Sequence, residues 1–185
     1  MELVIRKAER QDAIAAWDIR NAAILAHCTG YYHGEQLATW TDGEITDHFI
    51  ESVAEHWYVV TVSDTVVATG MLDCVTGQVD AIFVRPDRMG LGVGRAMLAH
   101  LECLAVESGL ARLTLDSTLN AAPFYRKCGF VGDQLSVYKS PRGISLACIP
   151  MAKQLLAQGI AGEQSHARQP AAEPESNGKS SGPAR

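Results

Sequence analysis

The sequence predicts an α+β (mixed α/β) layer fold with one central sheet and the element order βααβββαβαββ. Three observations predict it. Two β-rich runs, 57–62 and 65–72, are joined by a two-residue turn, which is typical of a hairpin. A long amphipathic pattern at 92–108 indicates a helix. The 185 residues are 47% hydrophobic and 20% charged, which suits one globular domain with a full core.

The N-terminal half begins with a predicted strand at 4–8. A helix is expected at 12–26, with Asp12 as its cap. The aromatic-rich stretch 29–41 is predicted to be a loop, and a short helix is expected at 45–54.

The C-terminal half alternates strands and helices. Pro86 ends a strand, and Gly109 closes the long helix. The remaining predicted elements are, in order, strand 78–84, helix 92–108, strand 112–115, helix 120–127, and strands 135–139 and 144–151.

Composition changes at Gly159, after which the chain is rich in Gly, Ala, Ser, Pro, Gln and Glu and has no large apolar residue beyond Ile160. Such a segment cannot bury enough apolar surface to become ordered. We therefore predict one domain at 1–158 and a disordered tail at 159–185.

Cysteine and charge patterns limit the possible environments and partners. The five cysteines are odd in number and include no CxxC pair, which argues against disulfides and a zinc site and predicts a cytoplasmic protein with no metal. The chain lacks both a signal peptide and an apolar run of about 20 residues, so no membrane association is expected. The net charge of −5 disfavours nucleic acid as a partner and mildly favours a cationic substrate. A homodimer remains open.

A strand leads into a helix through a turn with three alternating glycines, Gly90, Gly92 and Gly94. Glycine allows a positive φ and a close approach of the backbone to a ligand. The N-terminus of the following helix offers unpaired N–H groups and the positive end of its dipole, which together suit a phosphate. Arg88 and Arg95 flank the turn and could add charge-assisted contacts.

Several kinds of site compete for this turn. A P-loop requires Lys followed by Ser or Thr, but Arg95-Ala96 stands there. A dinucleotide fingerprint requires a third glycine at position 95, although Asp116 lies near where that fold places an acid. The chain is also too short for the other parallel units of such a fold. A tight turn without a ligand is the remaining alternative.

The stretch Met89-Gly90-Leu91-Gly92-Val93-Gly94 resembles the (Gln/Arg)-x-x-Gly-x-(Gly/Ala) motif of the GCN5-related N-acetyltransferase (GNAT) superfamily, with Met89 in place of Gln or Arg. A second stretch, from Asn120 through Phe124-Tyr125 to Gly129-Phe130, resembles another segment of this family. The resemblance extends over about 4–153. It implies a mostly antiparallel sheet flanked by helices, and an acetyltransferase domain at 1–158.

The resemblance also implies an activity. We expect direct transfer of acetyl from acetyl-CoA, as co-substrate, to a primary amine within a ternary complex. The acceptor could be a small molecule or a peptide. A non-catalytic acyl-CoA-binding sensor is the first alternative, and a nucleotide-binding regulatory domain is the second.

Residues that match the family motifs are expected to bind the donor. Main-chain groups of Ile82, Phe83 and Val84 should contact the pantetheine arm. Asn120 should also contact this arm, or cap its helix. The residues expected around the diphosphate are Arg88, Met89, Gly90, Leu91, Gly92, Val93, Gly94 and Arg95.

Two residues are expected to take part in proton transfer. Tyr125 matches the family tyrosine near the CoA sulfur and would protonate the thiolate; packing is its alternative role. Asp80 would be the base, from the same strand face as Ile82 and Val84. Its alternative role is that of an exposed strand-end acid, and Asp73, Glu35 and Asp116 are other candidate bases.

The acceptor side should involve the aromatic stretch. Tyr31, Tyr32, His33 and Trp40 could hold an amine through cation–π contacts. The alternative is that Trp40 and one tyrosine anchor this stretch to the core.

Overall fold

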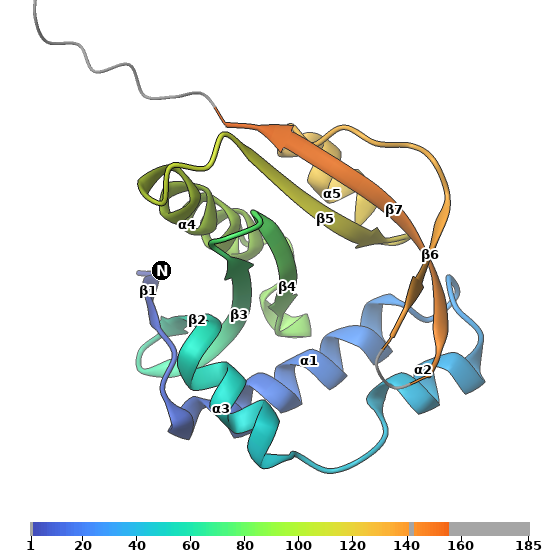
Figure 1. Cartoon of the computed structure of the whole chain (residues 1–185). Coiled ribbons are helices and arrows are strands. Elements are labelled where there is room, and N and C mark those ends of the chain that lie inside the picture. The colour runs from blue at the N-terminus through green and yellow to red at the C-terminus, as the bar shows by residue number, and fades with distance from the viewer. Residues whose placement is uncertain (1, 141–142, 156–185) are drawn as a thin grey trace, which may run out of the picture.

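A seven-stranded sheet with the order β1-β2-β3-β4-β5-β7-β6 forms the centre of the computed structural model (Figure 1). All neighbouring strands are antiparallel except β4 and β5. The strands are β1 (Val4–Lys7), β2 (Trp57–Val62), β3 (Thr65–Asp73), β4 (Gln78–Val84), β5 (Arg112–Thr118), β6 (Ser136–Lys139) and β7 (Ser145–Gln154). This arrangement confirms the predicted α+β class. The structure describes residues 2–140 and 143–155, and the predicted tail at 159–185 lies outside them.

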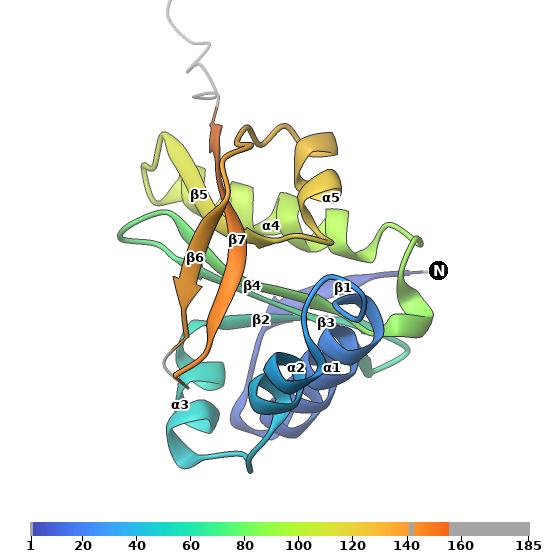
Figure 2. The same cartoon turned by 90° about the vertical axis from the view of Figure 1, so that its right-hand side faces the viewer.

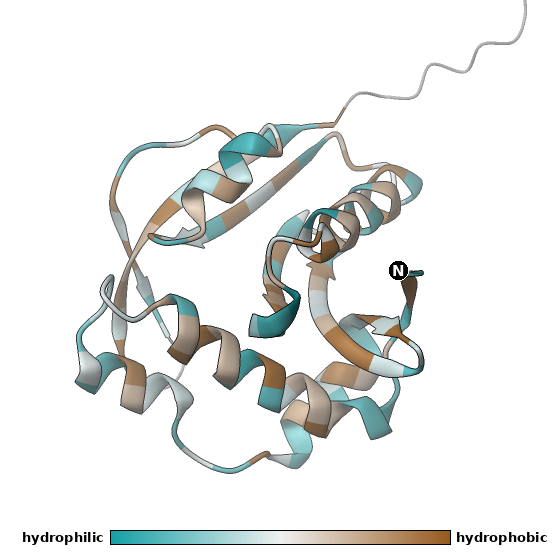
Figure 3. Cartoon of the chain, turned by 180° about the vertical axis from the view of Figure 1, so that it is seen from behind, coloured by the Kyte–Doolittle hydropathy of each residue, from teal (hydrophilic) through white to brown (hydrophobic). Residues whose placement is uncertain are grey.

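Helices cover both faces of the sheet (Figure 2). One face carries α1 (Ala13–His27), α2 (Gly34–Thr41) and α3 (Asp47–His56), and the other carries α4 (Val93–Glu107) and α5 (Ala122–Lys127). Hydrophobic and hydrophilic segments are interspersed along the helices (Figure 3). The predicted apolar face of α4 is confirmed, because Met97, Leu98 and Leu101 are fully buried against the sheet.

The helix α2 lies where the sequence predicts only a loop. It is eight residues long, too short for a periodic pattern to stand out. Contacts with distant parts of the chain hold it: Leu37 is buried, and the Gln36 amide donates to the carbonyl of Ser145 at 2.8 Å. The chain therefore has three α-helices between β1 and β2, where two were predicted, and a 3-10 helix at Arg10–Asp12 precedes them.

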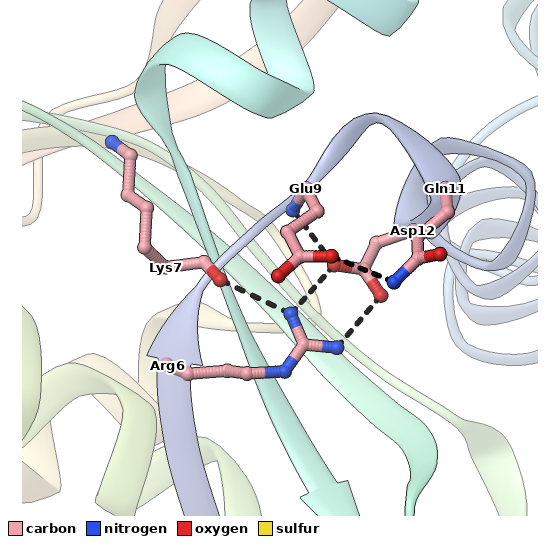
Figure 4. Close-up of polar contacts among 5 residues, drawn as sticks. All are labelled: Arg6, Lys7, Glu9, Gln11 and Asp12. Carbon is pink, nitrogen blue, oxygen red and sulfur yellow. Dashed lines mark hydrogen bonds and ion pairs between the residues drawn. The ribbon is translucent and has the colours of Figure 1, made fainter.

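Asp12 occupies the predicted N-cap position of α1, but its side chain makes no capping hydrogen bond there. It forms a two-pronged ion pair with Arg6 of β1, at 2.7 and 2.9 Å (Figure 4). It also accepts a hydrogen bond from the backbone N–H of Glu9 at 2.8 Å. The hydrogen bonds from Arg6 hold the pKa of Asp12 below its usual value, although burial opposes this effect. Asp12 thus ties the start of α1 to the edge of the sheet.

The strands β4 and β5 diverge along their length. Their register contains one pair, Gln78 with Thr114, and the Thr114 hydroxyl donates to the Gln78 side-chain oxygen at 2.7 Å. Beyond this point β5 continues to Thr118 while paired with β7, three residues farther than the prediction of 112–115. Since a twisted sheet normally keeps its strands about 4.8 Å apart, this divergence opens a wedge in its middle.

We expect His100 to make stability depend on pH. Its ring packs against that of Tyr58 in β2, with 4.9 Å between the ring centroids. Burial lowers the pKa of His100, and the negative charge of Glu107 partly offsets this shift. The unfolded chain therefore binds more protons below about pH 6.5, and the free energy of unfolding should fall as the pH drops from there. The measurement is melting temperature against pH for the wild type and His100→Phe, which keeps a ring against Tyr58. Equal slopes for the two proteins would contradict this expectation.

Candidate active site

The wedge between β4 and β5 adjoins two cavities. The glycine-loop cavity, of about 480 Å³, is bounded by Gly90, Gly92 and Asn120. The carboxylate cavity, of about 560 Å³, is bounded by Asp80 and Asp116. Both cavities share the lining residues Trp40, Ile82, Phe83, Thr118, Ala121 and Tyr125. The two cavities therefore meet within the split sheet.

Glycines shape the wall of the glycine-loop cavity. Gly90 and Gly92 have φ values of +75° and +84°, which side-chain-bearing residues rarely adopt. A Cβ at either position would meet no atom of a described residue within 4 Å, so the backbone borders open space. At Gly94 a Cβ would lie 3.4 Å from Val84 and 3.6 Å from Phe124, so this glycine lets α4 pack closely on β4 and α5. The loop thus brings bare backbone to the cavity.

This loop leads directly into α4, for which Gly92 is the N-cap. The first N–H groups of a helix have no partner within the helix, and they carry the positive end of its dipole. Arg88, Arg95 and Lys127 also line the cavity, while its described lining contains no carboxylate. The cavity is therefore suited to an anion such as a diphosphate.

The structure brings nearly all the predicted donor-binding residues to this cavity. Leu91 is the exception, because its side chain is 55% exposed and lies outside the lining. Asn120 lines the cavity but does not cap α5, whose N-cap is Ala121. The Asn120 side-chain oxygen instead accepts a hydrogen bond from the Cys28 thiol at 3.4 Å.

Asp80 lies at a β-bulge in β4. Met71 and Leu72 of β3 pair with Ala81 and Val79, so Asp80, between them, has no partner on β3. The bulge interrupts the alternation of faces on which the predicted placement of Asp80 beside Ile82 and Val84 rests. Asp80 and Ile82 both line the carboxylate cavity, and Ile82 and Val84 both line the glycine-loop cavity.

The environment of Asp80 suits proton transfer. Although the side chain is open to the cavity, the surrounding protein raises its pKa by desolvation. The negative charges of Asp73 and Asp116 raise this pKa further. Of these neighbours, Asp116 also lines the cavity, while Asp73 accepts hydrogen bonds from Val75 and Thr76 in a turn.

Tyr125 lies where the two cavities meet. Its ring packs edge-on against Phe124 and Phe130, at 5.1 and 5.7 Å between ring centroids. Burial raises the pKa of the Tyr125 hydroxyl well above its usual value, and Cys128 adds to this shift. The hydroxyl makes no hydrogen bond with any described residue. Tyr125 is thus both a packing residue and a protonated donor beside the wedge.

The aromatic stretch is only partly brought to the carboxylate cavity. Trp40 and Tyr32 line it, but Tyr31 and His33 do not. The Tyr32 hydroxyl donates to the Ala147 carbonyl at 2.7 Å and accepts from the Leu119 N–H at 3.0 Å. Tyr32 also packs edge-on against Trp40, so these two side chains anchor the stretch to the core.

Several residues that line the carboxylate cavity were not predicted from the sequence, because they come from distant segments of the chain. Asp116 is predicted only as an alternative base, and nothing local distinguishes Thr118. Trp17 and Tyr138 reach the carboxylate cavity from α1 and β6. No motif contains these residues, so only the folded arrangement identifies them.

The described residues contain neither a group of metal-ligating side chains nor a helix that could span a membrane. Within 2–140 and 143–155, no group of three or more His, Cys, Asp or Glu side chains could hold a metal ion. None of the helices in these ranges combines the length and apolarity needed to cross a bilayer.

Comparisons with known proteins agree with this geometry. A family model described as an acetyltransferase (GNAT) domain matches residues 53–132, which include the glycine loop, α4 and α5. No curated protein matches the chain.

Solved structures share the whole fold. A GCN5-related N-acetyltransferase from Rhodopseudomonas palustris is 26% identical with a TM-score of 0.77, over 84% of this chain and 97% of that one. The PaiA N-acetyltransferase from Thermoplasma acidophilum was solved with coenzyme A. It is 16% identical to this chain with a TM-score of 0.65, over 83% of this chain and 99% of that one.

A putative acetyltransferase from Salmonella typhimurium, YncA, was solved with acetyl-CoA. It is 20% identical to this chain with a TM-score of 0.60, over 88% of this chain and 98% of that one. This chain therefore resembles the GNAT acetyltransferases, both in the family match over residues 53–132 and in the fold shared with solved N-acetyltransferases.

Proposed function

We propose that this protein transfers an acetyl group from acetyl-CoA to a primary amine, directly and within a ternary complex. The observation that carries the proposal is the meeting of two cavities of different charge at Tyr125. The cations Arg88, Arg95 and Lys127 line one cavity, whereas the other is lined by two carboxylates, Asp80 and Asp116, and one arginine, Arg20. A polyanionic donor and a cationic acceptor would each find a complementary site.

The glycine-loop cavity would hold the donor. Backbone N–H groups at the start of α4 would bind the diphosphate. Main-chain groups of Ile82, Phe83 and Val84 border the same cavity, since β5 diverges from this part of β4, and they would contact the pantetheine arm. The thioester would then lie between Tyr125 and the carboxylate cavity. The neighbours from T. acidophilum and S. typhimurium hold coenzyme A and acetyl-CoA, which supports this class of ligand.

Asp80 would prepare the amine for attack. An amine is mostly protonated near neutral pH and must lose a proton before it can attack a carbonyl. Asp80 takes this proton, directly or through a water molecule. Its raised pKa makes it a stronger base than an ordinary aspartate.

Tyr125 would assist the leaving group. As the C–N bond forms and the C–S bond breaks, the nitrogen must lose a second proton and the sulfur must gain one. Tyr125 gives its proton to the sulfur and regains one from the nitrogen. An ordinary tyrosine is already protonated at neutral pH, and burial raises the pKa of Tyr125 further, so the hydroxyl is a hydrogen-bond donor whose full proton transfer to the sulfur is uphill.

The proposal is tested by measuring release of CoA from acetyl-CoA with a panel of primary amines, together with calorimetric binding of acetyl-CoA. Turnover with at least one amine is expected. Tight binding of acetyl-CoA without turnover on any amine would instead favour a sensor. Failure to bind acetyl-CoA would overturn the donor site itself.

We expect Asp80→Asn to lower kcat by about 100-fold, because the amide cannot accept a proton. Wild-type activity should fall as the pH drops through the raised pKa of Asp80, and the variant should lose this acidic limb. The measurement is kcat against pH, with Asp116→Asn as the matched control from the same cavity. A large loss in the control and none in Asp80→Asn would assign the base to Asp116.

A further inference from the structure

Cys28 and Asn120 connect two distant parts of the chain beside the glycine-loop cavity. Cys28 is the C-cap of α1, and Asn120 lies just before α5. The thiol donates a hydrogen bond to the Asn120 side-chain oxygen at 3.4 Å. Both residues line the cavity, and Cys28 is only 4% exposed. The contact therefore joins two walls of the same cavity.

The chemistry of this contact sets the orientation of the amide. Burial raises the pKa of Cys28 to about 11, so the sulfur carries a proton at neutral pH. A thiol donor faces the amide oxygen, and the two N–H groups of Asn120 are then directed elsewhere. The amide nitrogen makes no hydrogen bond with any described residue, and it is not among the buried polar atoms that lack a partner. Its N–H groups are therefore available to a ligand.

We infer that Cys28 is a positioning residue, which holds the Asn120 amide so that its N–H groups donate to an oxygen of the pantetheine arm. This inference rests on the proposed function, because it requires acyl-CoA in the glycine-loop cavity. The thiol makes no contact with the reacting atoms in this role. It acts by preventing the Asn120 amide from turning its oxygen toward the pantetheine oxygens, where two acceptors would meet.

A double-mutant cycle measured by calorimetry tests the inference on the full chain. Its members are the wild type, Cys28→Ala, Asn120→Ala and the double variant, each titrated with acetyl-CoA and with CoA. Cys28→Ala should raise Kd by about three- to tenfold, the range expected for one hydrogen bond. In the Asn120→Ala background the same change should have no further effect. Cys28→Ser, which restores a hydroxyl donor, should bind within about twofold of the wild type.

The cycle separates positioning from packing. A loss caused by a cavity at Cys28 alone would persist in the Asn120→Ala background, and that additive result would overturn the inference. Wild-type affinity in Cys28→Ala would overturn it as well. If the wild type itself binds neither ligand, the proposed function fails first. Cys103→Ala, which removes an exposed thiol on α4, should bind as the wild type does.

Discussion

Replacing Gly92 with Glu is expected to abolish measurable acetyl-CoA binding. Gly92 is the N-cap of α4, and its missing side chain leaves open space on the wall of the glycine-loop cavity. A glutamate there would fill the space proposed for the diphosphate and repel its charge. We expect Kd to rise by at least about 100-fold, equivalent to ~2.7 kcal/mol.

Controls separate this effect from backbone strain. Gly109 follows the other end of α4 with a φ of +76° and likewise has no described atom within 4 Å of an added Cβ. Gly109→Glu therefore matches the strain and the charge but lies outside the cavity, and it should bind acetyl-CoA as the wild type does. A negative charge at a helix N-terminus is favourable, so Gly92→Glu is expected to remain folded. Normal binding by folded Gly92→Glu would place the donor elsewhere.

Replacing Tyr125 with Phe should lower kcat by about 10²- to 10⁴-fold, the usual loss on removing a general acid. The ring and its edge-on contacts with Phe124 and Phe130 remain, so packing should survive. Affinity for acetyl-CoA should change little, because the proposed diphosphate and pantetheine contacts do not involve the hydroxyl. The variant thus removes only the proposed proton donor.

The measurement combines kcat at saturating substrates with calorimetric Kd for acetyl-CoA. Tyr58→Phe serves as the control, because Tyr58 packs against His100 and lines neither cavity. Its kcat should equal that of the wild type. An unchanged kcat in Tyr125→Phe, under conditions in which chemistry limits turnover, would leave Tyr125 as a packing residue only. The thiolate would then take its proton from water.

The predicted elements that the structure confirms are those specified by contiguous residues. The strand at 78–84 matches β4, and the helix predicted at 92–108 matches α4 to within one residue at each end. Pro86 and the loop glycines mark the end of the strand and the start of the helix. A 15-residue amphipathic helix also has enough turns for its period to be evident. The same local information predicts an anion site at the loop.

The predictions that were wrong depended on contacts across the fold. The short helix α2 is held by Leu37 and by the bond from Gln36 to Ser145. Asp80 lies at a shift in register between β3 and β4, which no pattern within β4 reveals. Asp12 binds Arg6 because β1 lies beside the start of α1.

The sequence by itself therefore determined the fold class and the glycine loop that leads into α4, because a strand, a glycine turn and a helix start are set by neighbouring residues. Tertiary structure alone decided the rest of the site. It separated β4 from β5, placed Asp80 and Asp116 around one cavity, and placed the Cys28 thiol within hydrogen-bond distance of Asn120, 92 residues away. Strand register and packing between distant segments determine these positions, and a one-residue shift in register is enough to move a side chain to the opposite face of the sheet.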